Sequence, residues 1–258
     1  MIGLPTLIGM VHLGPLPGAP AFAGDLDTVV AGAVRDAETL AEAGFGGLMV
    51  ENFGDAPFFA DTVPTATVAA MTRSVGAVAD AVGLPVGVNV LRNDALAALS
   101  VAAATGAAFV RVNVLSGSMF TDQGLVEGRA AEVARLRRAL GWDGLLMADV
   151  FVKHATPPPG LTLVQAVRDL AERSGADAIV VSGTGTGQAV DLGDARIVAR
   201  EAPGMPVVIG SGATPETIPA LLEVADAVIV GTAVKIDGVT TNPVDPTRAR
   251  EVADAAVT

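Results

Sequence analysis

The sequence predicts a single α/β domain over residues 1–258 that folds as a (β/α)8 barrel, also called a TIM barrel. The main observation is an internal repeat of short aliphatic runs in two alternating classes. Runs of one class start with glycine and proline, as in GLPVGVNV from Gly83 and GMPVVIGSG from Gly204, and proline is tolerated at the first residue of a strand. Runs of the other class follow a glycine that ends an Ala-rich segment, as in TGAAFVRVN from Thr105, and this glycine suits a left-handed helix cap.

The repeat places eight strands in order along the chain. Between them lie helical patterns, such as Leu26–Ala43 and Leu161–Arg173. Buried strands that alternate with amphipathic helices favour parallel strands joined by right-handed crossovers. A doubly wound open sheet is the alternative, but it gives no reason for two strand classes to alternate around all eight positions. The expected strands are Thr6–His12, Leu48–Asn52, Val86–Val90, Phe109–Val114, Leu145–Asp149, Ala178–Ser182, Val207–Ser211 and Ala227–Thr232.

Composition narrows the class of protein. The 258 residues are 51% hydrophobic, which suffices for one large core, and the absence of cysteine excludes disulfides and thiolate chemistry. A net charge of -12 argues against a nucleic-acid partner, and we interpret the Arg-containing segment Glu132–Gly141 as a solvated helix face. The first residues lack the features of a signal peptide, and the uncharged, Ala-rich run Ala95–Val110 is interrupted by Thr-Gly. We therefore expect a soluble, cytoplasmic protein with no membrane insertion.

Polar side chains gather at the carboxyl ends of the expected strands, where the active sites of such barrels lie. Leaving a buried polar group unpaired costs about 1–3 kcal/mol, so this accumulation indicates an enzyme. We predict that the substrate-binding residues are His12, Asn52, Asn89, Arg111, Asn113, Ser182 and Thr184.

The predicted catalytic residues are Glu51, Asp149, Lys153 and His154. A histidine near a carboxylate can act as general acid or base, and a lysine can pair with an anion or, if desolvated, become a nucleophilic amine. Lys153 is expected in a loop, where a lid would have to cover it; an exposed Lys-His pair is the alternative. Glu51, Asp149 and His154 could also bind Mg²⁺, but their spacing does not require a metal, and we assign no metal ligand.

The last two strands predict a phosphate site formed by Gly210, Ser211, Gly212, Gly231 and Thr232. In phosphate-binding barrels the loops after strands 7 and 8 hold the phosphate, often with the N-terminus of a short helix. Thr214 followed by Pro215 suits the start of such a helix. In the alternative these glycines only turn strand into loop. The Gly-rich segment Ser182–Asp191 is a candidate lid and does not match a GxGxxG fingerprint.

Seven segments together resemble the BtpA/SgcQ family, named for a photosystem I biogenesis protein: IGMVHLGPLPGAP, ENFGDAPF, VNVLRND, FVRVNV, ADVFVKHA, VSGTGTG and VIGSGAT with GTAVK. The resemblance extends from Ile8 to about Lys235 and implies a TIM barrel related to phosphate-binding barrels. Members also occur in organisms without photosynthesis, so a photosystem role need not apply. The resemblance implies no established catalytic assignment. The positions that match the family's polar strand ends are Glu51, Asn52, Asn89, Arg111, Asn113, Asp149, Lys153 and His154.

The leading functional hypothesis is an enzyme that acts on a sugar phosphate or nucleoside phosphate by isomerase, epimerase, aldol-type lyase or glycosyl-transfer chemistry. One alternative is a non-catalytic assembly factor that uses the barrel as a scaffold, and another is a transferase that uses a prenyl diphosphate. We also expect a homo-oligomer. Because Trp142 is the only Trp and there is no Tyr, an Ala/Val/Leu helix face would have to form its interface.

Overall fold

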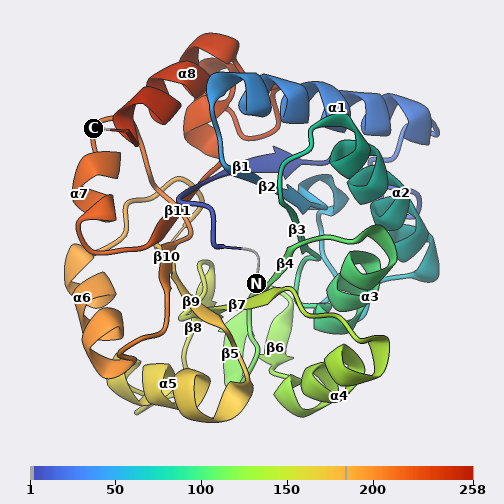
Figure 1. Cartoon of the computed structure of the whole chain (residues 1–258). Helices are drawn as coiled ribbons and strands as arrows, with labels where there is room; N and C mark the ends of the chain where they lie inside the picture. Colours follow the sequence, from blue (N-terminus) through green and yellow to red (C-terminus); the bar gives the residue numbers. More distant parts are fainter. Residues whose placement is uncertain (1–2, 184, 258) are drawn as a thin grey trace.

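The computed structural model describes residues 3–183 and 185–257, and its centre is a closed barrel of eight parallel strands (Figure 1). This confirms the predicted fold class, and a structural strand lies at each of the eight expected positions. Each of the eight strands pairs with the next barrel strand along the chain, and the first strand pairs with the last to close the ring. The strands are β1 (Leu7–His12), β2 (Gly47–Glu51), β3 (Val86–Asn89), β4 (Phe109–Val112), β7 (Leu145–Val150), β9 (Ala178–Val181), β10 (Val207–Ile209) and β11 (Ala227–Val230).

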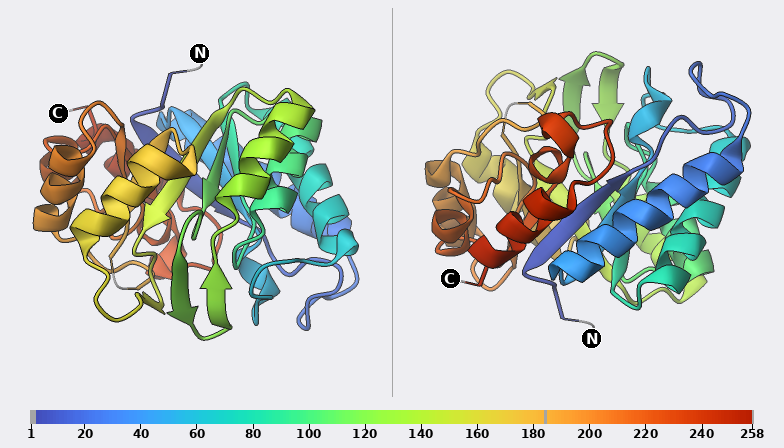
Figure 2. Two further views of the ribbon diagram at one scale, coloured as in Figure 1. Left: turned by 90° about the horizontal axis from the view of Figure 1, so that it is seen from below. Right: turned by 90° about the horizontal axis from the view of Figure 1, so that it is seen from above.

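Helices surround the barrel on all sides (Figures 1 and 2). The predicted range Leu26–Ala43 is found unchanged as α1, and the expected helix from Leu161 is found as α5, which continues into a π-helical turn over Leu170–Ser174. The glycines that follow three of the Ala-rich segments are left-handed, as the repeat predicts. The helices are α1 (Leu26–Ala43), α2 (Thr65–Ala81), α3 (Ala95–Thr105), α4 (Ala130–Leu140), α5 (Leu163–Asp169), α6 (Leu192–Glu201), α7 (Ile218–Leu222) and α8 (Pro246–Ala255).

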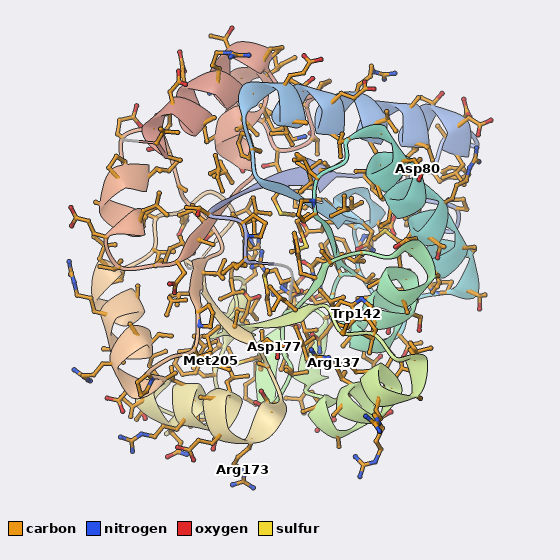
Figure 3. All side chains as sticks on the ribbon, in the orientation of Figure 1. Asp80, Arg137, Trp142, Arg173, Asp177 and Met205 are labelled. Atoms are coloured by element: carbon orange, nitrogen blue, oxygen red, sulfur yellow. The ribbon has the colours of Figure 1, made fainter. Side chains whose placement is uncertain are left out.

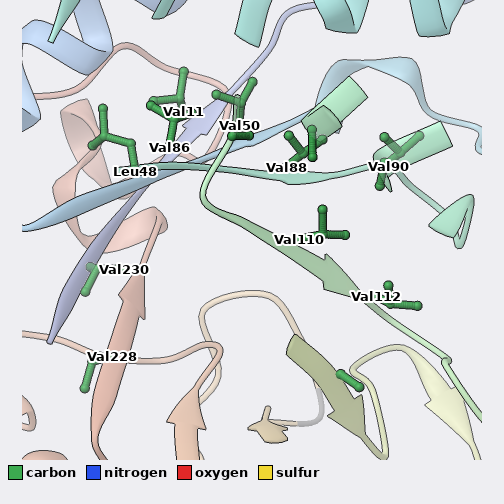
Figure 4. Close-up of a cluster of buried hydrophobic side chains, with 14 of the residues drawn as sticks. Val11, Leu48, Val50, Val86, Val88, Val90, Val110, Val112, Val228 and Val230 are labelled. Atoms are coloured by element: carbon green, nitrogen blue, oxygen red, sulfur yellow. The ribbon is translucent and has the colours of Figure 1, made fainter. Parts of the chain in front are cut away.

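Alternation along the strands divides the core into two layers. Valines and leucines on the outer face of the barrel pack under the helices, among them Val50, Val88 and Val110 (Figure 4). The intervening residues point inward and fill the barrel with larger side chains such as Met49, Phe109 and Met147. The barrel is thus solid below its carboxyl end, as expected for this fold.

The amino end of the barrel is closed by structural contacts. Arg137 pairs with Asp177 at 2.9 Å and lies over the Trp142 ring (Figure 3). The Trp142 indole in turn donates to the carbonyl of Ala107. These groups satisfy one another and hold neighbouring strand starts together.

A small antiparallel sheet, which we did not predict, stands at the carboxyl end of the barrel. β5 (Ser118–Thr121) and β6 (Gly124–Glu127) form a hairpin that projects beyond the barrel (Figure 2), and β5 also pairs with β8 (Ala155–Thr156). The pairs Phe120–Thr156 and Thr121–Ala155 fix the chain directly after Lys153 and His154. The hairpin therefore supports a loop that carries two predicted catalytic residues.

No helix in the described parts of the chain combines the length and the apolarity needed to cross a membrane.

Candidate active site

A buried ion pair occupies the centre of the barrel mouth. Arg111 on β4 donates two parallel hydrogen bonds to Asp149 on β7, at 2.8 Å from Nε and 2.7 Å from Nη2. The Ser182 hydroxyl donates to the same carboxylate at 2.9 Å. Burial disfavours the Arg111 charge, but Asp149 opposes that effect, and the pKa of Arg111 lies above its usual value. Because Asp149 is fully engaged, its geometry fits the positioning of Arg111 better than proton transfer.

Gly210 makes room for this ion pair. A Cβ atom at Gly210 would lie 3.0 Å from Arg111 Nη2 and 2.7 Å from Ser182 Oγ. The predicted phosphate-binding glycine thus also lets β10 approach the guanidinium closely.

Two of the three predicted asparagines, Asn52 and Asn89, bond to the backbone of neighbouring segments, and Asn113 bonds to Asn89. Asn89 donates to the carbonyl of Arg111 and to Asn113 Oδ1, both at 3.0 Å. Asn52 accepts from the amide of Leu91 at 2.7 Å and donates to Asp55 at 3.0 Å. All three are buried, and their bonds run between adjacent strands and loops. These buried side chains hold neighbouring segments together at the carboxyl end of the barrel.

His12 and Glu51 lie side by side at the ends of β1 and β2. His12 Nε2 is 3.8 Å from Glu51 Oε1, and its ring packs 4.9 Å from that of Phe53. Burial lowers the pKa of His12 well below its usual value, and the positive charges of Lys235 and Lys153 act in the same direction. His12 is therefore neutral at neutral pH, and Glu51 is the carboxylate next to it.

Lys153 and His154 follow β7 but face different surroundings. Lys153 is partly buried, and Arg92 donates to its backbone carbonyl at 2.5 Å. His154 is exposed and accepts a hydrogen bond from the backbone amide of Thr186 at 3.2 Å. Among the contacts described, His154 makes none with Asp149, which is bound to Arg111. The acid/base role predicted for these two residues stays a prediction.

The predicted phosphate residues line a cavity of about 150 Å³ at the mouth of the barrel. The loops after β10 and β11, including Gly210–Thr214 and Gly231–Ala233, form one side of it. His12, Arg111 and Lys153 also line this cavity. The structure therefore brings the basic side chains and the predicted phosphate loops together.

The details of these loops differ from the prediction in two ways. Thr214 does not cap a helix: it accepts from the amides of Thr217 and Ile218 in a turn, and α7 begins only at Ile218. The short α7 therefore offers no dipole at the loop. Gly212 has a φ of 71°, and a Cβ there would lie 2.1 Å from the carbonyl oxygen of Gln188, so this glycine is required by the fold.

The two predicted hydroxyls already have partners within the chain. Ser211 Oγ accepts from the amide of Gly183 at 2.8 Å, which joins the β10 loop to the β9 loop. Thr232 Oγ1 lies 3.0 Å from Thr240 Oγ1. Thr184, the remaining predicted binding residue, lies outside the described residues.

A larger cavity of about 380 Å³ adjoins the first. Glu51, Arg92 and His154 contribute to its wall together with Phe53 and Phe58. Lys153 and Thr186 line both cavities and so stand at their junction. The two spaces form a small anion-sized compartment next to a roomier one.

The candidate metal ligands are dispersed. Within residues 3–183 and 185–257, no three His, Asp or Glu side chains are grouped closely enough to hold a metal ion. Asp149 is bound to Arg111, while Glu51 lies beside His12.

The comparison with known proteins identifies the family. The sequence profile of the BtpA family matches residues 4–258. The chain belongs to the BtpA family. It is 47% identical over 242 residues to the photosystem I biogenesis protein BtpA of Synechocystis, covering 94% of this chain and 84% of that protein. It is 30% identical over 246 residues to the putative sgc region protein SgcQ of Escherichia coli, covering 94% and 91%.

Solved structures with the same fold are distant in sequence. N-(5'-phosphoribosyl)anthranilate isomerase from Pyrococcus furiosus matches this BtpA-family chain with a TM-score of 0.60 at 14% identity, covering 98% of both chains. Orotidine 5'-phosphate decarboxylase from Pyrococcus horikoshii matches with a TM-score of 0.56 at 15% identity, covering 97% and 99%. These likenesses establish the barrel fold.

Two residues that line the site, Arg92 and Thr186, were not among the predicted site residues, and neither was the structural ion pair of Lys235. Arg92 stands in the quoted segment VNVLRND, where its charge after a strand end was a usable signal. Thr186 lies in the Gly-rich loop, where no charged or otherwise unusual residue next to it in the sequence indicated a role. Lys235 is buried and bonds to Asp36 at 2.5 Å across 199 residues, a contact that no local pattern could reveal.

Proposed function

We propose that this BtpA-family protein is an enzyme that binds a small phosphorylated substrate at the carboxyl end of the barrel. The observation that carries the proposal is the 150 Å³ cavity, in which Arg111 and Lys153 are combined with the two Gly-rich loops after β10 and β11. Cationic side chains and exposed backbone amides are the two kinds of group that bind phosphate oxygens. The phosphate would lie against these loops.

The remainder of the substrate would occupy the 380 Å³ cavity. Its wall carries Glu51, and neutral His12 lies 3.8 Å from that carboxylate. A carboxylate and a neutral imidazole that lie side by side can each exchange a proton with a substrate atom that comes within hydrogen-bond reach. We therefore assign proton transfer to His12 and Glu51, and ligand orientation to Arg92 and His154. Isomerase, epimerase and aldol-type lyase chemistry all use such a pair.

The names of the two structural neighbours agree with this proposal, since one acts on a phosphoribosyl compound and the other on orotidine 5'-phosphate. Their low identity supports the fold only, so the proposal depends on the cavity in this chain.

A second candidate is a non-catalytic assembly factor. It is favoured by the name of the Synechocystis relative and by one surface feature: Phe120 and Leu125 form a cross-strand pair on the hairpin and are 50% and 49% exposed. Exposed apolar pairs of this kind can mark protein contacts. A scaffold would need this pair and would tolerate changes in the barrel mouth.

A paired ligand screen tests the proposal. Ribose 5-phosphate, dihydroxyacetone phosphate and nucleoside monophosphates are each compared with the unphosphorylated compound by thermal shift. We expect stabilisation by a subset of the phosphorylated members only, because a ligand stabilises the state that binds it. Lys153→Met should abolish the effect, whereas Phe120→Ser with Leu125→Ser should leave it intact. No phosphorylated compound stabilising the protein would contradict the proposal and favour the scaffold.

A further inference from the structure

Lysine is used at only two positions in this chain, Lys153 and Lys235, although it holds 16 lysines and arginines in total. Lys235 is 1% exposed and its ammonium is paired with Asp36, so its role is structural. Lys153 stands at the junction of the two cavities. Arginine could supply a positive charge there equally well, but only lysine can lose its proton and act as a nucleophile.

The surroundings of Lys153 favour the free amine. The structure describes no hydrogen bond or ion pair of its Nζ. Burial lowers the pKa of Lys153, and Arg111 and Arg92 act in the same direction, while the Glu51 and Asp149 carboxylates oppose this effect; the pKa lies below its usual value. Desolvation beside other cations is a recognised way to activate a lysine amine.

The backbone of Lys153 is held in place on both sides. Arg92 donates to its carbonyl, and β8 begins two residues later and pairs with β5 of the hairpin. A fixed backbone limits the positions that the Nζ atom can reach. The sequence predicted a catalytic Lys153 only if a lid covered it; the contacts with Arg92 and the hairpin hold its backbone in place.

We propose that Lys153 forms a covalent imine with the carbonyl carbon of the phosphorylated substrate, which makes that substrate an aldehyde or a ketone. This inference depends on the proposed function, because the phosphate places the carbonyl near Nζ. The Nζ lone pair attacks the carbonyl carbon, and the carbonyl oxygen takes up a proton. That proton comes from the nitrogen and gives a carbinolamine; the nitrogen then loses its second proton as the C–O bond breaks and the oxygen leaves as water. An amine and a carbonyl compound thus give an imine and water, with no change of oxidation state.

Glu51 is the group placed to move these protons. It shares the wall of the 380 Å³ cavity with Lys153, and His12 lies 3.8 Å from it. The carboxylate can take a proton from the attacking nitrogen and return it to the departing oxygen.

Pyridoxal 5'-phosphate is a direct probe, because it carries an aldehyde and a phosphate on one small ring. The full-length protein is incubated with the probe and reduced with borohydride, and the modified residue is located by peptide mass spectrometry. We expect Lys153 to be labelled at least about tenfold faster in the folded protein than in urea, where its pKa is that of an ordinary lysine. Inorganic phosphate should compete, and pyridoxal, which lacks the phosphate, should label Lys153 more slowly.

Matched controls separate this inference from the proposed function. Lys153→Arg keeps the charge and should retain phosphate binding in a calorimetric titration, but it should yield no adduct at this position. Glu51→Gln should slow the labelling while leaving phosphate affinity unchanged. Borohydride should also trap dihydroxyacetone phosphate on Lys153.

Two outcomes would overturn the inference. If phosphate binds but Lys153 is labelled no faster in the folded chain than in urea, the amine is not activated and only the proposed function stands. If phosphate neither binds nor competes, both the inference and the proposed function fail.

Discussion

The ion pair between Arg111 and Asp149 determines what the centre of the barrel can do. Two parallel hydrogen bonds fix the guanidinium, and Ser182 occupies a further position on the carboxylate. Because the two charges cancel, the ion pair can be buried without a net charge. The part of Arg111 that lines the cavity can still contact an anion. In the proposed function, proton transfer is therefore assigned to His12 and Glu51, whereas the sequence analysis named Glu51, Asp149 and His154.

Removing one partner of this pair should be costly. Asp149→Asn preserves the shape of the side chain but leaves the Arg111 charge buried and unpaired, which typically costs about 3–5 kcal/mol. Urea denaturation should show this loss of the free energy of unfolding. Ser182→Ala removes one hydrogen bond to the same carboxylate and should cost only about 1 kcal/mol. Equal stabilities for Asp149→Asn and the wild type would contradict the geometry of the pair.

At the scale of elements, the hairpin β5–β6 is the main departure from the predicted barrel. It packs on the mouth through Met119 and Val126, which form a small cluster with Val114 and Val152 that is separate from the barrel core. Through β8 it holds the segment after Lys153 and His154. Its role is to position the loop, and its exposed face is the pair Phe120–Leu125.

Loosening the hairpin should affect the site locally. Val126→Ala deletes two methyl groups from the separate cluster, so hydrogen exchange should accelerate in residues 118–127 and 152–156. The melting temperature of the barrel should hardly change. Leu125→Ala, on the exposed side of the same strand, is the matched control and should leave exchange unaltered. Uniform acceleration across all eight barrel strands would show instead that the hairpin belongs to the global core.

The barrel strands could be predicted because their signals are local. Gly-X-Pro starts and left-handed glycines recur along the chain and precede most of the strands, without any knowledge of their neighbours. The hairpin was missed because SMFTDQGLVEG is short and interrupts the expected segment between two barrel strands. The predicted helix start at Thr214 was wrong because residues 215–217 form a turn and α7 begins only at Ile218.

For the whole molecule, the sequence predicts where functional residues gather but not how they pair. The rule that parallel strands end at one edge brought His12, Glu51, Arg111 and Lys153 to a common mouth. Which carboxylate pairs with which cation depends on the directions in which the side chains point around the closed barrel. The spacing of these residues in the sequence does not reveal those directions. The expected homo-oligomer stays a prediction, to be checked by light scattering against the mass of one chain.

The central claim is that the loops after β10 and β11 bind a phosphate group. Gly212→Asp cannot test it, because φ and the Gln188 carbonyl require glycine there. Thr214 also lines the cavity and offers an isosteric pair of variants, Thr214→Asp and Thr214→Asn, which differ in charge alone. Both should fold as the wild type does, since either side chain suits the turn.

The most direct measurement is calorimetric titration of inorganic phosphate into the wild type and these two variants at one ionic strength. The carboxylate of Thr214→Asp should repel the anion and weaken its binding by about tenfold or more, which corresponds to roughly 1.4 kcal/mol. Thr214→Asn should bind phosphate as the wild type does. Equal affinities for all three proteins would contradict the claim and place the anion elsewhere.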